Sequence, residues 1–585
     1  MDMLLRHVTI EDLAHILQAH QARSPLPELF DENVRQRAVK LARSNGLWQA
    51  LDEELDRERP ITVVRRSLAR EFSRTGERAR AEQEIGHRRK RLHQAALALW
   101  LSHPKADLDD LQDLIWAFCH DDTWVSPAHP RPIDLGAAQF AASLAEIVRL
   151  FKHQVEPEII ERVHTELVER IYNPFWDWTH PQSWQTARHN WNHVINGEIV
   201  RTALYDIDSP TLLAHMIHPA INHMTYAIDG FGDDGGCFEG PSYWDYGFGH
   251  YLKASYALYQ KTAGAINLMR EEKLQAICRF PLATDLDAPI RATFSDAAYG
   301  YLSTEHVLLA NRFIALPELY RLAAQHDDGS LRLSSLRELA LYGGEKAPQT
   351  PDLRDYFLPD LGFVKLRGTP SVHSLSLTAV ASHNGANHNH NDLGSFMLYR
   401  DKTAYIVDPG RPRYRRDTFS SRRYESLFCN SWGHSVPIIN GLGQPAGRTF
   451  YARMTIENLN QSPTKVCRVD LTRAYAPGLL ARFERVFRLD QAQMHLLDTF
   501  HFHTVPSELE EAFITFEPAR LVDQDQAVCL GSGPFMQVSS HSPGRFVLEP
   551  RPEAALDDVQ GRTLMRVLFV PETLATEMTL GFTFG

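Results

Sequence analysis

The residue types best suited to chemistry gather in one stretch of the chain, residues 387–444. It opens with Asn-His-Asn-His-Asn-Asp at 387–392 and continues through an Asp-Pro-Gly turn at 408–410 to Tyr414 and His434. Hydrophobic, strand-like segments surround these groups. Packing alone does not require so many polar, metal-competent side chains between strands, and we therefore expect the functional site here.

Two histidines of this stretch are candidate metal ligands. His388 and His390 would lie on the same side of an extended backbone, because side chains alternate along a strand. One could bind a metal while the other faces a groove. Asp408 and His434 follow at separations that a sheet can close, which offers nitrogen and oxygen donors together. Such a set suits Zn²⁺, with Mn²⁺ or Ca²⁺ as alternatives, but the wide spacing is not diagnostic by itself.

Six arginines lie within thirteen residues after the Asp-Pro-Gly turn. Guanidinium groups bind carboxylates and sulfates through paired hydrogen bonds, so an acidic sugar chain is a natural partner. The alternative is ion pairing inside the protein, for example with Asp417 or Glu425, and this would account for at least half of the group. The six are Arg411, Arg413, Arg415, Arg416, Arg422 and Arg423.

In the first half of the chain, aromatic and polar side chains gather in two places. One is Trp184 with the segment 188–193, and the other is the segment 238–247, which follows the glycine-rich residues 230–236. Glycines are costly within a helix, so the second segment is predicted to be a loop. Loops that display Tyr, Trp, His and Asn are typical of sugar-binding surfaces, although an Asn-His pair is more often a helix cap.

Length and composition limit the class of protein. With 585 residues the chain is too long for one hydrophobic core, and two or three domains are expected. A net charge of −12 argues against nucleic-acid binding, although a local basic groove could still hold a polyanion. The six cysteines are scattered without a CxxC pair, so we expect free, buried thiols.

Nothing in the sequence predicts contact with a membrane. The first residues lack the basic region and apolar run of a signal peptide, and charges interrupt the later apolar stretches before membrane-spanning length. We therefore expect a soluble, cytoplasmic protein, with secretion by another route as the alternative. The sequence leaves the oligomeric state open.

Residues 1–345 are predicted to be mainly helical. Asp134 is a plausible N-cap for a helix over 135–153, Pro157 opens another, and Ser209 caps a helix whose first residue is proline. Successive helices with short loops and no intervening strands indicate helical hairpins packed in a ring or an incomplete toroid. Periodicity alone allows an irregular bundle equally well.

Residues 346–585 change to the two-residue period of strands. Short strands at this spacing indicate antiparallel sheets packed in layers. The predicted fold class is therefore a multidomain α+β protein, with helices first and sheets second. The strand-like segments are 374–380, 396–399, 404–407, 466–471, 483–489, 494–500, 513–516, 546–549, 563–569 and 578–584.

Several short motifs join these polar residues to glycine, proline or aromatic neighbours: 387–392, Gly-Ser-Phe at 394–396, 408–410, Arg-Tyr at 423–424, Ser-Trp-Gly-His-Ser at 431–435 and Asn-Gly at 440–441, with Asn-His at 192–193 and Glu-Gly-Pro-Ser-Tyr at 239–243. Together they resemble the heparinase II/III-type polysaccharide lyases. The resemblance covers both halves in the right order, and the motifs of the second half are the more specific. It implies an N-terminal α/α toroid followed by a C-terminal antiparallel β-sandwich.

The resemblance implies cleavage of a uronate-containing chain at C4 by β-elimination. The C5 proton is barely acidic while the neighbouring carboxylate keeps its charge, so hydrogen-bond donors must neutralise that carboxylate and stabilise the enolate. By resemblance, Asn192 and His388 take this role, with His193 as a neutraliser or base. Tyr243 would remove the C5 proton, protonate the leaving O4 or do both, and Tyr414 could share this work.

The resemblance also implies a metal site. His390, Asp408 and His434 match the family's ligand pattern, and the divalent metal, Zn²⁺ foremost, would hold the loop that carries His388 and Tyr414. This structural role fits the chemistry, because β-elimination needs no metal-activated water.

The partner implied by the resemblance is an acidic polysaccharide or oligosaccharide. Glycosaminoglycans such as heparan sulfate, chondroitin or hyaluronan are the first expectation. Tyr246 is the alternative to Tyr243 if the glycine-rich loop aligns differently. The residues expected to contact the sugar chain are Trp184, Trp191, Glu239, Tyr246, Arg413 and Arg423.

Three other functions fit parts of the sequence. Alginate is an alternative substrate for a lyase of this architecture. A glycoside hydrolase on an α/α toroid would need two flanking carboxylates, which Glu198, Glu239 and Asp245 could supply, but the His-rich segment would then be unexplained. An inactive carbohydrate-binding protein would keep the tryptophans and arginines, yet it has no use for Tyr243 together with His388.

Overall fold

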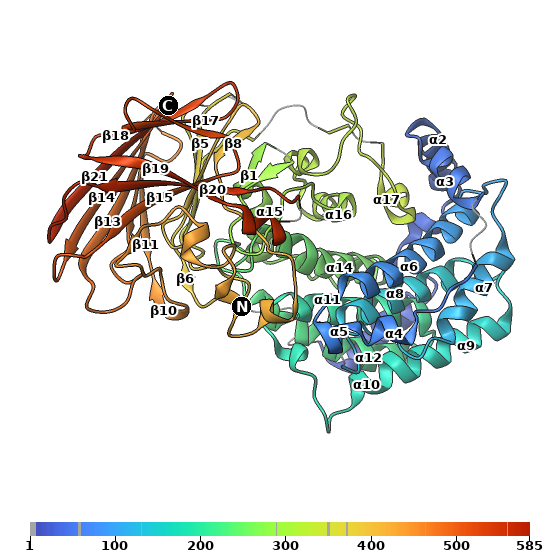
Figure 1. Ribbon diagram of the computed structural model, residues 1–585. Helices are drawn as coiled ribbons and strands as arrows, with labels where there is room; N and C mark the ends of the chain where they lie inside the picture. Colours follow the sequence, from blue (N-terminus) through green and yellow to red (C-terminus); the bar gives the residue numbers. More distant parts are fainter. Residues whose placement is uncertain are drawn as a thin grey trace. The chain divides into compact units, whose positions relative to one another are not determined.

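The computed structural model describes residues 8–56, 60–129, 131–287, 289–344, 346–347, 352–369, 373–461, 464–558 and 560–585. The chain forms two compact units (Figure 1). The helical unit comprises residues 1–230, 245–275 and 302–349, and the β unit comprises residues 231–244, 276–301 and 350–585. Two segments of the first half therefore fold with the β unit, a chain path that differs from the single division expected near residue 345.

The helical unit is built from α-helices joined by short loops: α1 (Ile10–Ala19), α2 (Glu32–Ser44), α3 (Leu47–Leu55), α4 (Arg66–Ala69), α5 (Glu71–Thr75), α6 (Ala79–Trp100), α7 (Leu108–Cys119), α8 (Leu135–Leu150), α9 (Pro157–Leu167), α10 (Asn173–Trp176), α11 (Asn190–Asp206), α12 (Pro210–Ile228), α14 (Gly249–Lys261), α16 (Thr304–Ile314) and α17 (Leu336–Leu341). The almost fully buried helix α11 packs against α8, α12 and α14. Helix α14 also packs against α16, which in turn packs against α17. This series of helix pairs is the incomplete α/α toroid that the sequence predicts.

The helix starts follow the capping chemistry read from the sequence. The side chain of Asp134 accepts the backbone N–H of Ala137 at 2.7 Å and so caps α8. Ser209 caps α12, and proline occupies the first position of both α9 and α12. Among the described residues, no helix combines the length and apolar character needed to cross a membrane.

The β unit contains three main antiparallel sheets. One has the strand order β3 (Tyr356–Leu358), β4 (Phe363–Arg367), β5 (Ser376–Val380), β7 (Phe396–Arg400), β8 (Thr403–Ile406). The largest has the order β11 (Arg453–Glu457), β12 (Lys465–Asp470), β13 (Leu480–Leu489), β14 (Met494–Phe502), β21 (Glu577–Phe584), β18 (Met536–Ser540), β17 (Ala527–Leu530), β16 (Ala519–Val522). The third has the order β19 (Gly544–Arg551), β20 (Leu564–Pro571), β15 (Leu509–Thr515), β9 (Ile438–Ile439).

The shorter elements of the β unit carry the connections that matter below. The first segment of this unit, 231–244, ends with α13 (Pro241–Tyr243). The second, 276–301, begins within α15 (Glu272–Thr284) and contains the two-stranded pair of β1 (Asp285–Asp287) and β2 (Ile290–Arg291). A second pair joins β6 (His383–Asn384) to β10 (Gly447–Tyr451).

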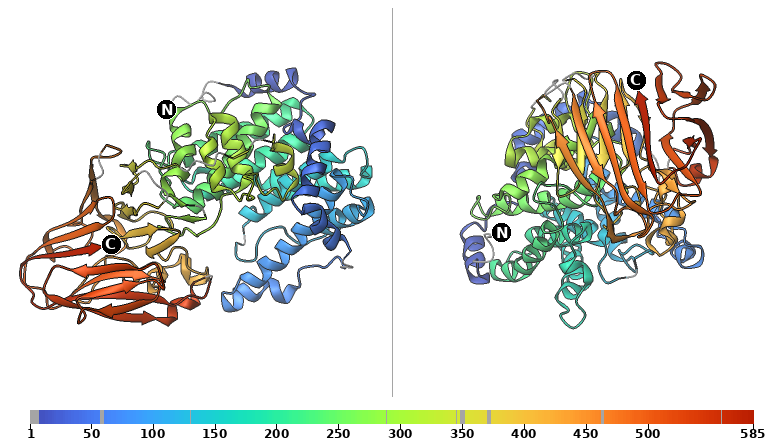
Figure 2. Two further views of the ribbon diagram at one scale, coloured as in Figure 1. Left: turned by 90° about the horizontal axis from the view of Figure 1, so that it is seen from above. Right: turned by 90° about the vertical axis from the view of Figure 1, so that its left-hand side faces the viewer.

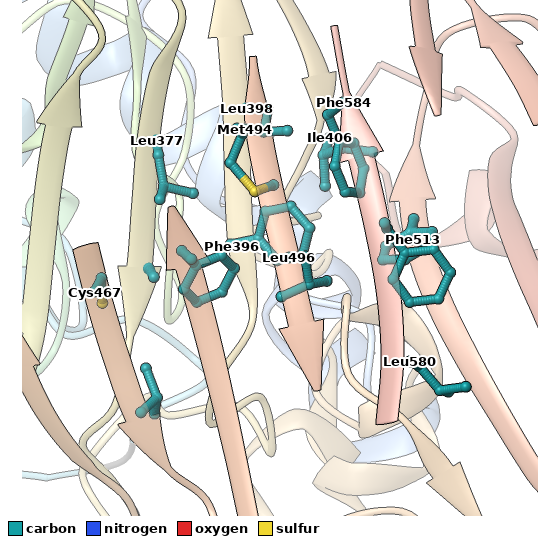
Figure 3. Packing of buried hydrophobic residues seen from close by; sticks show 14 of the residues in the cluster. Leu377, Phe396, Leu398, Ile406, Cys467, Met494, Leu496, Phe513, Leu580 and Phe584 are labelled. Atoms are coloured by element: carbon teal, nitrogen blue, oxygen red, sulfur yellow. The ribbon is translucent and has the colours of Figure 1, made fainter. Parts of the chain in front are cut away.

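One hydrophobic core holds the sheets of the β unit together. The right-hand view of Figure 2 shows the strands of the eight-stranded sheet side by side. Side chains of this sheet meet those of the five-stranded sheet in a common layer (Figure 3). Phe396 of β7 lies at its centre, with ring centroids 5.2 Å from Phe487 and 5.7 Å from Phe584. The expected antiparallel β-sandwich is confirmed.

A fully buried arginine ties this core to two loops. Arg485 of β13 pairs with Asp498 and Glu511, each at 2.6 Å. Its Nη1 donates to the carbonyl oxygens of Gly394 and Ser435 at 2.8 and 2.7 Å. Gly394 lies two residues after the polar motif at 387–392, and Ser435 is the last residue of the motif at 431–435. Arg485 and its two carboxylate partners thus hold the C-terminal ends of the two loops that carry the polar motifs.

Replacing Arg485 with methionine is expected to destabilise the β unit by about 3–5 kcal/mol, because two buried carboxylates would lose their cation. Urea unfolding measures the change. The matched control is Arg488→Met on the same strand, where the arginine is exposed and a change within about 0.5 kcal/mol is expected. Equal effects of the two substitutions would contradict this role for Arg485.

Candidate active site

His388 occupies a strained position in the loop between β6 and β7. Its φ angle is +59°, a conformation that is uncommon for residues other than glycine and costs about 1–3 kcal/mol. The carbonyl oxygen of His388 accepts the backbone N–H of Asp296 at 3.2 Å, which helps to hold the turn. Strain of this kind is concentrated at functional sites, where neighbouring contacts maintain it.

Two tyrosine hydroxyls meet beside His388. The Oη atoms of Tyr243 and Tyr414 are 2.6 Å apart, and the ring of Tyr243 stacks on the imidazole with centroids 4.1 Å apart. Tyr414 also donates to Asp296 Oδ2 at 3.0 Å, since a carboxylate only accepts. The contact between the tyrosines is therefore donated by Tyr243, which leaves the lone pairs of the Tyr243 oxygen free to accept a proton.

The local sequence fastens Tyr243 at this place. Gly240, just before α13, has a φ of +94°, and a Cβ there would come within 2.9 Å of the carbonyl oxygen of Phe294. Glycine alone fits this approach. The hydroxyl of Ser242 accepts a backbone N–H from the same neighbouring segment at 3.0 Å. The glycine and serine of the motif at 239–243 thus serve to position its tyrosine.

The carboxylate of Asp296 binds four side chains of this site. Oδ2 accepts from His388 Nδ1 at 2.7 Å and from Tyr414, while Oδ1 accepts from His390 Nε2 at 3.0 Å and from Arg423 Nη2 at 2.8 Å. Burial alone would raise the pKa of Asp296, but the hydrogen bonds from both histidines, with the charge of Arg423, hold it well below its usual value. Burial and the nearby Asp296 charge also raise the pKa of Tyr243 and of Tyr414, so both hydroxyls keep their protons at neutral pH.

Exposed side chains lie beside the tyrosine pair. The ring of Phe419 is 55% exposed and meets the ring of Tyr414 edge-on, with centroids 4.9 Å apart. The exposed guanidinium of Arg411 lies 5.4 Å from the centre of the Tyr414 ring. An apolar ring and a guanidinium at one place can receive a sugar ring and its acidic group. From the sequence, Arg411 was a candidate only as one of six clustered arginines, and Phe419 was not identified as a candidate.

The predicted metal ligands come together in the β unit. His390, Asp408 and His434 form a buried group with Asp392, in which one ligand atom of each lies within 4.8 Å of the others. No sequence argument singled out Asp392 as a ligand. Two facing carboxylates and two imidazoles form a nitrogen and oxygen donor set that suits Zn²⁺.

The hydrogen bonds of the two histidines point their free nitrogens into this group. His390 donates through Nε2 to Asp296, and His434 donates through Nε2 to the carbonyl oxygen of Phe428 at 3.1 Å. The Nδ1 atoms of both histidines are buried and have no hydrogen-bond partner among the described residues; that of His434 lies 3.3 Å from Asp408 Oδ2. Metal-binding histidines are held in this way, with the second nitrogen bonded to an acceptor. The residues present therefore fit a divalent cation.

A second group of possible ligands shares His390 but suits a metal less well. It consists of Asp296, His390 and Cys429. Arg423 already neutralises Asp296, and burial raises the pKa of the Cys429 thiol to about 12, which leaves it a poor ligand. All six cysteines of the chain are unpaired, as predicted, and five of them are buried.

The candidates in the helical unit have contacts that do not favour the roles expected of them. Both amide donors of Asn192 are taken, by the carbonyl oxygens of Gln185 at 2.8 Å and His223 at 2.9 Å. His193 lies buried with Nε2 3.2 Å from the Met224 carbonyl oxygen, and burial lowers its pKa to about 3. Neither side chain offers a charged or free donor to a carboxylate.

The aromatic candidates of the helical unit differ in exposure. Trp184 is 1% exposed and stacks on Phe175, so it cannot contact a sugar. Trp191 is half-buried beside Arg131, whose guanidinium lies 5.4 Å from its ring centre. The hydroxyl of Tyr246 accepts a hydrogen bond from Gln139 at 2.8 Å. Trp191 and Tyr246 are both half-buried, so Trp184 is the one of these three predicted contacts that is enclosed by protein.

The remaining predicted contacts lie in the β unit. Glu239 is buried, with Oε1 3.7 Å from His388 Nε2. Arg413 is exposed. Arg423 is directed inward, where it binds Asp296 and the carbonyl oxygen of Asn389, so it supports the site instead of facing solvent.

The helical toroid and the β-sandwich with its histidine-bearing loop define a known class of fold. Residues 350–504 match the family described as heparinase II/III-like, C-terminal. The chain thus carries the C-terminal domain of the heparinase II/III-type family, which confirms the resemblance of its motifs. The match contains His388, Tyr414 and the candidate metal ligands but not Tyr243 or Asp296. No curated protein sequence matches the chain.

Solved structures share the fold at low sequence identity. The heparan sulfate lyase HepC of Pedobacter heparinus is 14% identical with a TM-score of 0.59, over 98% of this chain and 87% of that one. A heparinase III gene product is 13% identical with a TM-score of 0.60, over 93% and 90% of the two chains. A xanthan lyase of Paenibacillus is 11% identical with a TM-score of 0.53, over 86% of this chain and 53% of that one.

Proposed function

We propose that the protein is a polysaccharide lyase that cleaves uronate-containing chains by β-elimination. The observation that carries the proposal is the pair of hydroxyls of Tyr243 and Tyr414, 2.6 Å apart, beside His388. Structures of the same fold include lyases of heparan sulfate and of xanthan. A heparinase II/III-like C-terminal domain around His388 supports the same chemistry.

The hydrogen-bond chain of the site provides a path for the proton. Tyr243 accepts the C5 proton as its own proton moves to Tyr414, which in turn passes one to Asp296. The electron pair of the C5–H bond forms the C4–C5 double bond, and the C4–O4 bond breaks. The low pKa of Asp296 favours return of the proton along the chain, and Tyr243 then protonates the leaving O4.

We assign neutralisation of the substrate carboxylate to His388. Its Nδ1 donates to Asp296 at 2.7 Å, and Glu239 lies 3.7 Å from Nε2. An imidazole that donates from Nδ1 to Asp296 and also carries a proton on Nε2 can donate from Nε2 to the uronate and lower the energy of the enolate. Asn192 and His193 are assigned to the packing of α11, because their donors bind backbone carbonyl oxygens.

The candidate metal has a structural role in this proposal. His390 and His434 would hold it through Nδ1, together with Asp392 and Asp408. When bound, the cation neutralises two buried carboxylates and fixes the loop at 387–392. No step of the elimination passes through it. Zn²⁺ is the first expectation from the donor set.

Acidic glycosaminoglycans are the proposed substrates, with alginate as the alternative. A glycoside hydrolase is disfavoured because Glu198 is buried and paired with Arg201 at 2.6 Å, and Asp245 is taken by His306 at 2.8 Å. An inactive binding protein is disfavoured by the strained His388 and the hydrogen-bonded, half-buried tyrosine pair, which sugar binding alone does not require.

The assay that tests the proposal offers heparan sulfate, chondroitin, hyaluronan and alginate and follows the ultraviolet absorbance of a C4–C5 unsaturated uronate. Growth of this absorbance with one of the chains is the expected result. New reducing ends without absorbance would show hydrolysis and overturn the proposal. Binding without any cleavage would favour the carbohydrate-binding alternative.

Arg411 gives a test of the acidic substrate. Replacing it with glutamine is expected to raise KM about tenfold, equivalent to about 1.4 kcal/mol, with kcat little changed, because a guanidinium contact to the substrate is lost. Steady-state kinetics measure the change. The control is Arg415→Gln, whose guanidinium is held by Asp557 at 2.9 Å and should not affect KM. Equal KM values for both variants would contradict the assignment.

A further inference from the structure

The two oxygens of Asp296 face two different groups of residues. Oδ2 accepts from His388 and Tyr414, which the proposed function makes catalytic. Oδ1 accepts from Arg423 and from Nε2 of His390, whose other nitrogen points into the candidate metal group. One buried carboxylate therefore contacts residues of both parts of the site directly.

The tautomer of His390 decides whether this link holds. A neutral imidazole carries its proton on one nitrogen only. A cation bound at Nδ1 requires the proton on Nε2, where it is donated to Asp296 Oδ1. With the proton on Nδ1 instead, the Nε2 lone pair would face the carboxylate and repel it. Metal binding at Nδ1 thus keeps Asp296 in the position from which Oδ2 orients His388 and Tyr414.

We propose that Asp296, in addition to its place in the proposed proton path, positions the site by coupling metal binding at His390 to the orientation of His388 and Tyr414. The catalytic half of this inference rests on the proposed function, whereas the metal half stands on its own contacts. The coupling matters because His388 has a strained φ angle. A strained residue keeps its conformation only while its contacts, here the one to Asp296, are maintained.

The informative variant is Asp296→Asn. An amide of the same shape has one accepting and one donating end, so it cannot accept from both histidines. The first expected result is an affinity for Zn²⁺ that is about 10–100-fold weaker, measured by competition with a chelating dye and without any substrate. The second is a kcat lowered about 100-fold with KM within a factor of about three.

The decisive comparison measures kcat before and after removal of Zn²⁺. Chelation is expected to lower kcat of the unchanged protein, which Zn²⁺ restores. In the Asp296→Asn variant, chelation is expected to change kcat by less than about twofold, since the link is already broken. A variant that keeps normal Zn²⁺ affinity, or loses the same factor of kcat on chelation, would overturn the inference.

Two further variants separate coupling from general damage. Asp355→Asn alters another buried carboxylate of the β unit, one that binds Lys465 at 2.9 Å and the N–H of Arg367 at 2.8 Å. It should lower stability but leave Zn²⁺ affinity unchanged. Asp296→Glu keeps the charge but moves it by one methylene, and it should repeat the loss of Zn²⁺ affinity if Asp296→Asn does not fold. Normal affinity in a folded Asp296→Glu variant would count against the inference. If no substrate is cleaved even by the unchanged protein, the proposed function fails while the Zn²⁺ measurements still decide the coupling.

Discussion

Replacing Tyr243 with phenylalanine is expected to lower kcat of uronate cleavage by about 10²–10⁴-fold, the usual contribution of a general acid–base. The Tyr243 hydroxyl is the end of the proton path through Tyr414 to Asp296, and phenylalanine keeps the ring that stacks on His388. KM should therefore change by less than about threefold, because the hydroxyl acts in the transition state more than in binding. Initial rates of ultraviolet absorbance over a range of substrate concentrations measure both constants.

The control for this experiment removes a buried hydroxyl elsewhere in the β unit. Tyr475 donates to the carbonyl oxygen of Pro437 at 2.8 Å and, among the described residues, makes no hydrogen bond to a proposed catalytic residue. Tyr475→Phe is expected to cost about 1 kcal/mol of stability and to leave kcat unchanged. If Tyr243→Phe retains more than a tenth of the kcat of the unchanged protein, Tyr243 is not the acid–base residue.

The parts of the fold that local chemistry determines were predictable from the sequence. The caps at Asp134 and Ser209 need only a side-chain oxygen before the first turn. The long strands β13 and β14 alternate between buried and less buried residues, and this alternation is visible as a two-residue period. The weaker strands β16–β18 were missed, because their few residues carry too little of the pattern to be distinguished from loops.

The site was predictable only where its residues lie close together in the sequence. His388, His390 and Asp408 belong to compact motifs, whereas Asp296 is a lone aspartate 92 residues before His388. No local pattern marks it, because its role depends on segments 276–301 and 387–392 folding into one unit. Asp392 was visible within its motif, but its place beside the metal ligands follows from the loop conformation.

Residue type also does not distinguish exposed side chains from side chains bound inside the protein. Arg411 and Arg423 belong to the same arginine-rich run, yet one guanidinium is exposed beside Tyr414 and the other is bound to Asp296. Trp184 and Trp191 share a segment, but the first is buried. Partners and exposure depend on tertiary packing, which the order of residues in a loop does not reveal.

Removing the divalent metal is expected to lower the thermal stability of the β unit. A cation present at a thousand times its Kd stabilises the folded state by about 4 kcal/mol, which corresponds to a shift in Tm on the order of 8 °C for a unit of this size. The physical reason is the pair of facing carboxylates of Asp392 and Asp408, which are buried and lose their counter-charge. Scanning calorimetry with and without a chelator, followed by re-addition of Zn²⁺, measures the shift.

The ligand assignment is tested by His434→Ala, which removes one of the two buried Nδ1 atoms of the candidate metal group. The affinity of this variant for Zn²⁺ should be about one hundredfold weaker, and its Tm should no longer respond to the chelator. The control is His495→Ala, a half-exposed histidine of β14 whose Nδ1 contacts the Thr583 hydroxyl at 2.9 Å. Its metal-dependent shift should equal that of the unchanged protein. If His434→Ala retains the full shift, the cation is held elsewhere, and the group of His390, Asp392 and Asp408 is a buried polar cluster without a metal.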